Sequence, residues 1–476
     1  MGTTVQTEPL TCDVVIVGCG VAGLYAALNL PASMQVVMLS KSAAEDCDSM
    51  LAQGGICVLP EAADYDAYFA DTLAAGHYEN RRESVEIMIR SSRAVVNDLV
   101  ALGVEFEREP DGSLAFTREG AHSRPRIAYH GDITGREITT KLLAAVRRLP
   151  NVRLLEYTPV IDLIVEDGAC AGVLAVPVSA ERSVDTVEEL RARLGLNVDF
   201  SLGSGDPASE GLGAPFEIRA RTTVLATGGI GGVYEHSTNF PQLTGDAVFL
   251  ANEYGARQKD LDYVQIHPTG LYSEQPGRTF LISESARGEG AVLLDAAGER
   301  FTDELQPRDV VAAAIQNQMR ADETDYEWLS FEPVEPEVVT THFANIREHC
   351  IEEVERDILE DPIPVVPTQH YFMGGIWVDR DSATTVPGLY AAGETACNGV
   401  HGRNRLASNS LLESLVFARR AAWKMATGES LPVEEVGEPA LDGQHRPLGA
   451  GGLNIDALLI EKGTVPISIT SGEERP

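Results

Sequence analysis

Apolar and β-branched residues near the start of the chain form a pattern typical of a buried strand, a helix and a second strand. Asp13–Val17 is an apolar run that ends at Gly18, Ala22–Leu30 has the composition of a helix, and Gln35–Leu39 is again apolar. Short continuous apolar runs are typical of strands that are buried on both faces of a parallel sheet. The sequence therefore predicts a βαβ unit in this region.

Helical and strand patterns continue after this unit. Amphipathic and apolar stretches predict further helices at Tyr65–Ala75, Ser84–Leu102, Arg136–Arg148 and Ser408–Met425, and strands at Val152–Glu156, Val160–Val165, Glu217–Ala226 and Gly388–Glu394. Residues 178–215 differ, because they are rich in Ser, Gly, Asp and Glu and contain one helical stretch, Val187–Leu194. We expect them to form a mobile surface insertion.

The length and charge of the chain limit its organisation and partners. A chain of 476 residues is expected to form two or three domains. Its formal net charge of -35 argues against nucleic acid or an anionic membrane as a partner, because both need a positive protein surface. Two interpretations of this charge stay open: an ordinary acidic protein, or one adapted to a cytoplasm of high salt, where screening reduces repulsion. A loss of stability on adding molar KCl would exclude the second.

The seven cysteines are scattered and form no CxxC pair, which argues against a disulfide framework or an iron–sulfur site. No group of His, Cys and Asp residues has the spacing of metal ligands, so we expect no metal. The first residues lack the basic region of a signal peptide, and no apolar run approaches the ~20 residues of a membrane span. The sequence therefore predicts a cytoplasmic protein without a membrane partner.

Gly18, Gly20 and Gly23 form a GxGxxG motif between the first predicted strand and helix. In this context Gly18 permits a tight turn, Gly20 lets the backbone approach a pyrophosphate, and Gly23 lets the helix pack on the strand. The helix N-terminus then favours the phosphates. The acidic ribose-binding residue expected after the second strand is missing, because Ser40 and Lys41 stand there. We expect Lys41 to meet a phosphate or a backbone carbonyl.

Three later segments favour FAD over NAD as the dinucleotide. Gly388–Glu394 combines a strand, small residues and an acid, as in segments of FAD proteins that return to the first domain. Ser408–Leu412 opens a helix whose positive end can point at the flavin. Thr227–Gly229 supplies a third close approach. Together with the glycine motif, these segments predict an FAD site.

Several motifs resemble those of the succinate dehydrogenase/fumarate reductase/aspartate oxidase flavoprotein family. They are Asp48–Ile56, His267–Thr269, Arg287–Gly290, His370–Gly375 and His401–Ser410. The implied fold is α/β, with a discontinuous Rossmann-like FAD-binding domain at 1–235 and 353–428. The resemblance also implies an inserted α+β capping domain at 236–352 and an abbreviated C-terminal tail at 429–476. This tail departs from the aspartate oxidase pattern, in which a longer helical domain follows.

The resemblance implies how the cofactor is held. In respiratory members a histidine just before the AQGG segment carries the flavin covalently, whereas Asp48 stands at that position here. Noncovalent FAD is therefore implied. The cofactor-binding residues expected from the motifs and the resemblance are Gly18, Gly20, Gly23, Ser40, Lys41, Asp48, Ser49, Gln53, Gly54, Gly55, Thr227, Gly228, Asp246, Glu394, Ser410 and Leu411.

Residues 117–124 resemble the substrate loop of the aspartate oxidase branch, in which Glu119 is linked to recognition of the amino group. A carboxylate facing an ammonium is a favourable pairing. The resemblance implies that His267, His370 and Arg405 bind carboxylates and that Arg287 handles the proton at the carbon next to the hydride. The neutral substrate-binding residues expected beside them are Gln265, Ser283 and Ser408.

The implied reaction is FAD-dependent oxidation of L-aspartate to iminoaspartate, with O₂ (giving H₂O₂) or fumarate as acceptor. This would be the first step of de novo NAD biosynthesis, with iminoaspartate passing to quinolinate synthase; no oligomeric state follows from the sequence. Two alternatives stay open. A soluble fumarate reductase or succinate dehydrogenase flavoprotein is disfavoured by Asp48 and Glu119, and a flavin-binding protein with little catalysis is disfavoured by the retained histidines and arginines.

Overall fold

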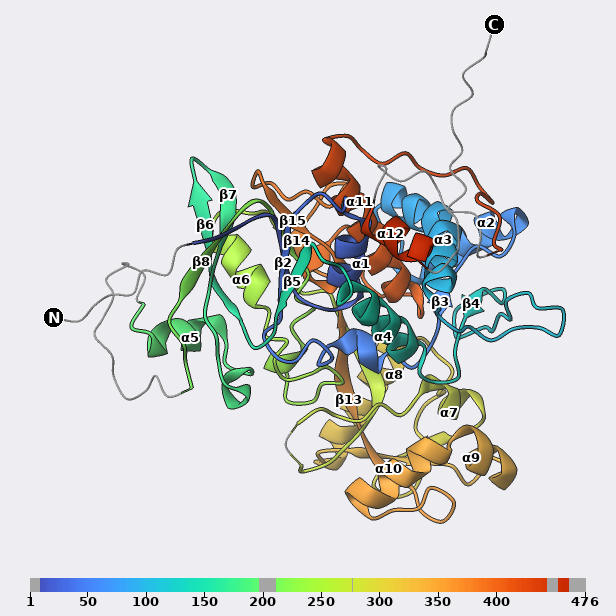
Figure 1. Ribbon diagram of the computed structural model, residues 1–476. Helices are drawn as coiled ribbons and strands as arrows, with labels where there is room; N and C mark the ends of the chain where they lie inside the picture. Colours follow the sequence, from blue (N-terminus) through green and yellow to red (C-terminus); the bar gives the residue numbers. More distant parts are fainter. Residues whose placement is uncertain (1–8, 197–210, 276, 443–452, 462–476) are drawn as a thin grey trace, which may run out of the picture.

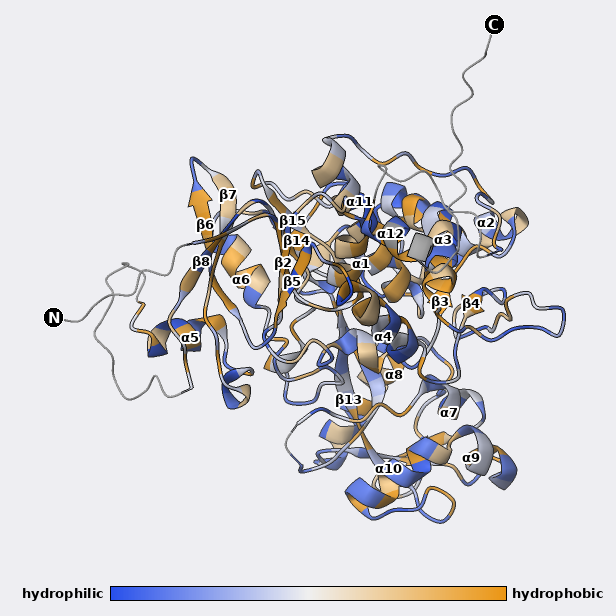
Figure 2. Cartoon of the chain, in the orientation of Figure 1, coloured by the Kyte–Doolittle hydropathy of each residue, from blue (hydrophilic) through white to orange (hydrophobic). Residues whose placement is uncertain are grey.

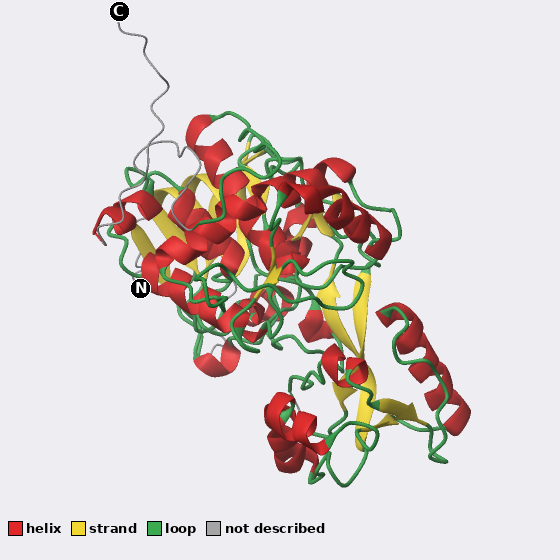
Figure 3. Ribbon diagram, turned by 90° about the vertical axis from the view of Figure 1, so that its right-hand side faces the viewer, coloured by secondary structure: helices red, strands yellow, loops and turns green. Residues whose placement is uncertain are grey.

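A computed structural model describes residues 9–196, 211–275, 277–442 and 453–461 of the chain. A larger body is built around one sheet and a smaller lobe around another (Figure 1 and Figure 3). The long strand β13 (Ile363–Phe372) leads from one part into the other. Within the described residues, no helix is long and apolar enough to cross a membrane.

The main sheet forms from the apolar runs that the sequence predicts as strands. Its path is β5 (Val152–Leu155), β2 (Val36–Leu39), β1 (Leu10–Val17), β8 (Phe216–Leu225), β7 (Ala169–Ala175) and β6 (Val160–Glu166), with β15 (Leu389–Ala391) also paired to β8. The pairs among β5, β2, β1, β8 and β15 are parallel, whereas β6, β7 and β8 pair antiparallel. The α/β fold class is confirmed.

Helices cover both faces of this sheet because its central strands are apolar on both sides. Val14 and Ile16 of β1 pack under one layer, whereas Val15 and Val17 pack under the other. The first layer contains α1 (Val21–Asn29), α2 (Tyr65–Ala75), α3 (Arg82–Leu102), α4 (Thr134–Val146), α11 (Asn409–Thr427) and α12 (Asn454–Glu461), and the second contains α5 (Val187–Arg193) and α6 (Asp246–Glu253). In Figure 2 the strands of the sheet carry mostly the hydrophobic colour.

The insertion expected at 178–215 is packed against the body over much of its length. Its helix α5 begins with a capping box, in which Glu189 N donates to Thr186 Oγ1 at 3.2 Å and Thr186 N donates to Glu189 Oε2 at 2.7 Å. The apolar side chains of α5 are buried in the second helical layer. Residues 178–196 are therefore packed against the body, the mobility of the insertion stays a prediction, and residues 197–210 lie outside the described part of the chain.

The smaller lobe is an antiparallel sheet covered by helices. Its strand order is β10 (Val264–Leu271), β13, β12 (Glu327–Ser330) and β11 (Val292–Leu294), and its helices are α7 (Glu284–Gly288), α8 (Arg308–Asp322), α9 (Pro336–His342) and α10 (Ala344–Val354). It has an apolar core of its own. β13 lies outside the 236–352 range expected for a capping domain, yet it pairs with both β10 and β12. The domain boundaries stay a prediction, and β13 links the two parts.

Two small sheets and the tail complete the body. β3 (Ile56–Cys57) pairs with β4 (Ile127–Ala128), and β14 (Gly375–Trp377) pairs with both β9 (Gln258–Lys259) and β16 (Ala396–Cys397). The segment 429–442 lies along α3, where Arg93 donates to the carbonyl oxygen of Gly437 at 2.7 Å and Asn97 to that of Ala440 at 2.7 Å. This segment therefore covers a helix of the body.

Candidate active site

A cavity of about 1020 Å³ lies between the main sheet and the smaller lobe, and residues of both line it. It extends from the glycine motif after β1 to His267 and His370 of the second sheet. The structure brings to its wall all the residues predicted to bind cofactor or substrate except Gly23 and Gln265. The motifs spread over the sequence therefore belong to one continuous site.

The glycine motif lets β1, α1 and the segment after β8 pack closely together. Gly18 has a φ of 111°, and a Cβ there would lie 2.0 Å from the carbonyl oxygen of Ala226. A Cβ at Gly23 would lie 2.1 Å from the carbonyl oxygen of Gly18, so α1 packs directly on β1. The first N–H group of α1, that of Val21, donates to Ser49 Oγ at 3.1 Å. A pyrophosphate at this helix end fits the dipole and the next backbone donors of the first turn.

Ser40 and Lys41 follow β2, where an acid was expected. Both line the cavity, but the three donors of Lys41 Nζ are already engaged. They contact Asp246 Oδ2 at 2.7 Å, Thr244 Oγ1 at 3.0 Å and the carbonyl oxygen of Gln242 at 3.2 Å. Lys41 was expected to meet a phosphate or a backbone carbonyl, and in the structure it contacts a backbone carbonyl. Lys41 and Asp246 form an ion pair that fixes the cavity edge.

Asp48 and Glu394 place carboxyl groups in the wall of the cavity. Phe240 N donates to Asp48 Oδ1 at 2.9 Å, and Phe372 N donates to Glu394 Oε1 at 2.8 Å. Asp48 Oδ2 is buried and has no hydrogen-bond partner. Burial raises the pKa of Asp48 to about 7 and that of Glu394 to about 8. Such groups fit the ribose hydroxyls and polar edge of a dinucleotide cofactor, which would satisfy them on binding.

The loop after β8 carries the predicted Thr227 and Gly228. Thr395 donates its hydroxyl to the carbonyl oxygen of Gly228 at 2.8 Å, and the Thr227 and Thr395 hydroxyls lie 3.0 Å apart. A Cβ at Gly229 would lie 2.2 Å from Glu394 Oε1. The glycines therefore allow the segments after β8 and β15 to meet at the cavity.

His267 and His370 lie together at the far end of the cavity, with ring centroids 5.6 Å apart. Thr269 N donates to His267 Nδ1 at 3.2 Å, so the proton of this ring is on Nε2. Thr238 Oγ1 lies 2.8 Å from His370 Nδ1. Burial and the neighbouring arginines hold the pKa of both histidines well below the ordinary value. Both imidazoles are therefore neutral, and His267 keeps an Nε2–H donor for a carboxylate.

Arg405 reaches the cavity from the loop before α11. Its Nε and Nη2 donate to Gln265 Oε1 at 3.2 Å and 3.0 Å, and its Nη1 donates to Ser410 Oγ at 3.0 Å. Burial, with Arg308 nearby, lowers the pKa of Arg405 to about 10, so it remains a cation at neutral pH. Arg308 Nη1 also donates to Gln265 Oε1, at 3.3 Å. Gln265 was expected to contact the substrate, but it does not line the cavity. Its Oε1 instead accepts hydrogen bonds from both arginines, which do.

Arg308 is a site residue that the sequence reasoning missed. It is the first residue of α8, lines the cavity, and donates from Nε to Glu284 Oε2 at 2.6 Å. The only local signal was Pro307 before a helical pattern, which marks a helix start and no function. Burial raises the pKa of Glu284, but Arg308 and Arg287 outweigh burial and hold it below the ordinary value.

Arg287, the residue predicted to handle a proton, lies on α7 and is 3% exposed. Its Nη1 donates to the carbonyl oxygen of Glu304 at 2.7 Å, while its Nε and Nη2 have no hydrogen-bond partner. Burial lowers its pKa. The predicted Ser283 is the N-cap of the same helix, and its hydroxyl lies 2.7 Å from that of Ser285.

Glu119 lies against the turn that contains Gly54 and Gly55. Its Oε2 accepts a hydrogen bond from Ser408 Oγ at 2.7 Å, and Ser408 Oγ accepts one from Gly55 N at 3.2 Å. A Cβ at Gly54 would lie 2.6 Å from Glu119 Oε1. The carboxylate therefore occupies a fixed place in the cavity wall, and Ser408 serves as its anchor. No group of three or more His, Cys, Asp or Glu that could hold a metal occurs among the described residues.

Comparison with known proteins identifies relatives of the whole site. A family model described as FAD binding domain matches residues 13–411. The L-aspartate oxidase of Clostridium perfringens is 44% identical over 86% of this chain and 85% of its own length. The L-aspartate oxidase of Neisseria meningitidis is 39% identical over 90% of this chain and 80% of its own length.

Solved structures support the same fold. A quinol fumarate reductase of E. coli has a TM-score of 0.74 at 27% identity, and the match covers 96% of this chain and 74% of that one. Mycobacterium smegmatis Sdh1 in complex with UQ1 has a TM-score of 0.73 at 32% identity, and the match covers 88% of this chain and 69% of that one. The fold of this chain is therefore shared with these two proteins.

Proposed function

Because the chain belongs to the FAD-binding-domain flavoproteins and, within them, to the L-aspartate oxidase family, we propose that it oxidises L-aspartate to iminoaspartate. It binds FAD through the glycine motif, the segment 48–55 and the loops after β8 and β15. Bound FAD supplies the acceptor for the hydride that leaves the aspartate Cα. The substrate ammonium loses a proton as the carbon–nitrogen double bond forms.

The placement of Glu119 carries this proposal. The substrate has two carboxylates and an ammonium, so its site needs both positive groups and one negative group. Arg405, Arg308 and the two neutral histidines supply cations and donors at one end of the cavity. Glu119 supplies a carboxylate in the wall of the same cavity. A dicarboxylate without an amino group would leave this carboxylate without a cationic partner.

We assign the handling of protons to Arg308 and Glu284, in place of Arg287. Arg308 lies beside Arg405 on Gln265 and faces Glu284 directly. The charge of Arg308 helps to lower the pKa of both His267 and His370, whereas of these two histidines Arg287 affects the pKa of His267 alone. A cation paired with a buried carboxylate next to the substrate is a favourable place to give and take a proton. Arg287 then supports Glu284 electrostatically.

The proposed product and acceptors follow from this chemistry. The electrons pass on to fumarate, which fits the same dicarboxylate site, or to O₂ with release of H₂O₂. Iminoaspartate is an imine that water hydrolyses, so an enzyme that consumes it promptly is expected; we propose quinolinate synthase, in the first steps of NAD biosynthesis. Noncovalent attachment of FAD and a cytoplasmic location stay predictions.

Anaerobic addition of L-aspartate to the purified yellow protein tests the proposal, with succinate in a parallel sample. We expect L-aspartate to bleach the flavin absorbance, and air to restore it with formation of H₂O₂. Bleaching by succinate alone would instead favour the fumarate reductase or succinate dehydrogenase alternative. A holoprotein that neither compound bleaches would favour a flavin-binding protein with little catalysis.

A further inference from the structure

The loop that carries Glu119 has little regular structure of its own. Between its bridge at Thr117 and the start of β4 it contains turns, and Ala121 has a φ of 64°, a conformation that L-residues rarely adopt. Within the loop, His122 N donates to the carbonyl oxygen of Glu119 at 3.3 Å. A carboxylate on such a loop is directed precisely only if other side chains hold the loop.

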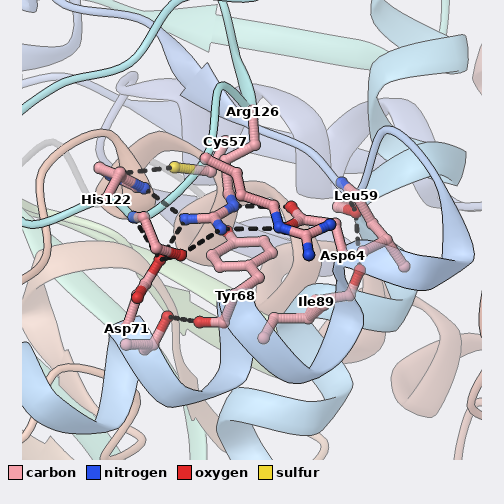
Figure 4. Close-up of polar contacts among 12 residues, drawn as sticks. Cys57, Leu59, Asp64, Tyr68, Asp71, Ile89, His122 and Arg126 are labelled. Carbon is pink, nitrogen blue, oxygen red and sulfur yellow. Dashed lines mark hydrogen bonds and ion pairs between the residues drawn. The ribbon is translucent and has the colours of Figure 1, made fainter.

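Arg126, just after this loop, is the centre of a buried polar cluster drawn in Figure 4. It is fully buried, and it donates from Nε and Nη2 to the two carboxylate oxygens of Asp64 at 2.8 Å and 3.0 Å. Its Nη1 donates to Asp71 Oδ2 at 2.6 Å and to His122 Nδ1 at 2.9 Å, and its Nη2 donates to Ser123 Oγ at 3.3 Å. All five N–H groups of the guanidinium are therefore used.

These contacts determine the state of His122. Because Arg126 donates to Nδ1, this nitrogen must be an acceptor, and the ring proton is on Nε2. Nε2 then donates to the carbonyl oxygen of Ala407 at 3.0 Å. Burial and the charge of Arg126 lower the pKa of His122 to about 4, so the ring stays neutral. One tautomer is thus selected, and it ties the loop to the residue before Ser408.

Two hydrogen bonds attach the loop to consecutive residues at the start of α11. His122 donates to Ala407, and Ser408 donates to Glu119. The Asp71 carboxylate holds the loop from a third direction, because it accepts from Ser123 N at 2.8 Å and from Ser123 Oγ at 2.7 Å. On the opposite side, a Cβ at Gly120 would lie 2.5 Å from Glu284 Oε1 of the smaller lobe.

We propose that Arg126 is a positioning residue which, through His122, directs the Glu119 carboxylate and so determines the preference for a substrate with an amino group. The inference rests on the proposed function of Glu119 as the partner of the substrate ammonium. Arg126 itself does not line the cavity. If Arg126 were purely structural, its replacement would weaken the binding of every ligand alike. If it positions Glu119, its replacement weakens the binding only of ligands that carry an ammonium.

The test compares the affinity of holoenzyme variants for L-aspartate and for succinate, which differs in lacking the amino group. Arg126→Lys keeps the charge beside Asp64 but has three donors in place of five, so it cannot hold Asp64, Asp71, Ser123 and His122 all at once. We expect the Kd or KM for L-aspartate to rise by roughly tenfold or more, as for loss of a hydrogen bond to a charged group. The Kd of succinate, measured from the flavin spectrum, should stay within about twofold.

His122→Phe is the second variant, because it keeps a buried ring and removes both nitrogens. It should reproduce the selective loss, and it decides the matter if Arg126→Lys gives no holoenzyme. Arg124→Lys is the matched control: its side chain is 50% exposed and its Nε lies 3.6 Å from Asp64 Oδ1. Lysine keeps the cation beside Asp64, so the affinity for neither ligand should change. Glu119→Gln is the reference, since it tests the proposed function directly.

The outcomes separate the two levels of the argument. Suppose that Glu119→Gln weakens the binding of L-aspartate but not of succinate, whereas Arg126→Lys and His122→Phe weaken the binding of both ligands equally or of neither ligand. The positioning role is then refuted and the proposed function stands. If Glu119→Gln leaves the ratio of the two affinities unchanged, the proposed role of Glu119 fails and the inference fails with it. Selective loss in all three variants supports both.

Discussion

Arg308 Nε lies 2.6 Å from Glu284 Oε2, and both residues belong to the smaller lobe rather than to the sheet that carries the glycine motif. The lobe thus contributes a paired cation and carboxylate to a cavity whose other wall comes from the main sheet. The complete set of site residues therefore forms only when the lobe packs against the body. This division suits an enzyme in which closure of the lobe excludes water around the substrate.

Conservative replacement of the two candidate arginines should separate their roles. We expect Arg308→Lys to lower the turnover of L-aspartate with fumarate by about 10²–10⁴-fold, the usual contribution of a positioned acid or base. Arg287→Lys should lower it by less than about tenfold, because Arg287 acts through the field at Glu284. Stopped-flow kinetics of both half-reactions, with succinate affinity as a check of binding, measure the effect.

Arg320→Lys, at an exposed position of the same helix α8, is the control and should leave turnover unchanged. A larger loss in Arg287→Lys than in Arg308→Lys would return the proton-handling role to the residue expected from sequence.

The predicted order of strands and helices was largely correct because it depends on local periodicity. The βαβ unit, the strand at β8 and the long helix α11 lie within a few residues of their predicted limits. Apolar alternation and glycine positions carry such information within a short window. The docking of α5 was not visible, because the helix packs against strands that are distant in sequence.

The candidate site was predictable where a motif was contiguous and not where tertiary structure assembles it. Gln265 and His267 are two residues apart on β10 and should face the same side. Register shifts between Gln265 and Ile266 and after His267 break this alternation, and only His267 lines the cavity. Arg308 lies 43 residues from Gln265 in sequence, and only the folded lobe brings them together. Neither fact leaves a trace in local composition.

The contact between Gly54 and Glu119 predicts a selective effect of Gly54→Ala. Gly54 does not have a positive φ, so alanine is compatible with the backbone, but its Cβ would lie 2.6 Å from Glu119 Oε1. The carboxylate must move, and we expect the KM for L-aspartate to rise by roughly tenfold while succinate binds as before. Steady-state kinetics and succinate titration check this.

Gly55→Ala is the comparison variant for Gly54→Ala. A Cβ at Gly55 would lie 2.4 Å from the carbonyl oxygen of Ala128, which is backbone and cannot move aside. This variant should lose folding stability, seen as a lower melting temperature, instead of substrate selectivity. Equal melting temperatures for the two variants would contradict the packing argument.

The ion pair between Lys41 and Asp246 predicts a combined effect on stability and cofactor affinity. Asp246 Oδ1 also accepts from Val187 N at 3.1 Å, so the pair joins the cavity edge to α5. Lys41→Met leaves a partly buried carboxylate without its cation, and we expect a loss of about 1–3 kcal/mol in the free energy of urea unfolding. FAD should bind more weakly, measured by fluorescence titration.

Lys141→Met is the matched control for this effect. Lys141 lies 3.4 Å from Glu137 in an i,i+4 pair on α4, with a side chain that is 34% exposed. Such pairs contribute about 0.3–0.5 kcal/mol. If both variants lose the same small amount, the Lys41 pair has no special role at the cavity edge.

Buried groups beside the site give the stability of the protein two opposing dependences on pH. Burial lowers the pKa of His401 to about 3, below its value of 6.5 when unfolded. The stability that this neutral ring confers is therefore present above pH 6.5 and is lost as pH falls towards the folded pKa. Burial raises the pKa of Glu413 to about 7, above its unfolded 4.5, so its contribution is present below pH 4.5 and is lost as pH rises towards 7.

Single substitutions of these two groups, neither of which lines the cavity, should change the pH dependence with opposite signs. Below about pH 6.5 the unfolded chain binds one more proton at His401 than the native protein does, so His401→Asn should reduce the slope of unfolding free energy against pH by up to about 1.4 kcal/mol per pH unit. Between about pH 5 and 6.5 the native protein binds one more proton at Glu413, so Glu413→Gln should increase the slope by a similar amount. Urea unfolding of holoenzyme across this range measures both slopes, whatever the loss in absolute stability. Parallel pH profiles for the wild type and both variants would mean that neither group holds its predicted charge state in the folded protein.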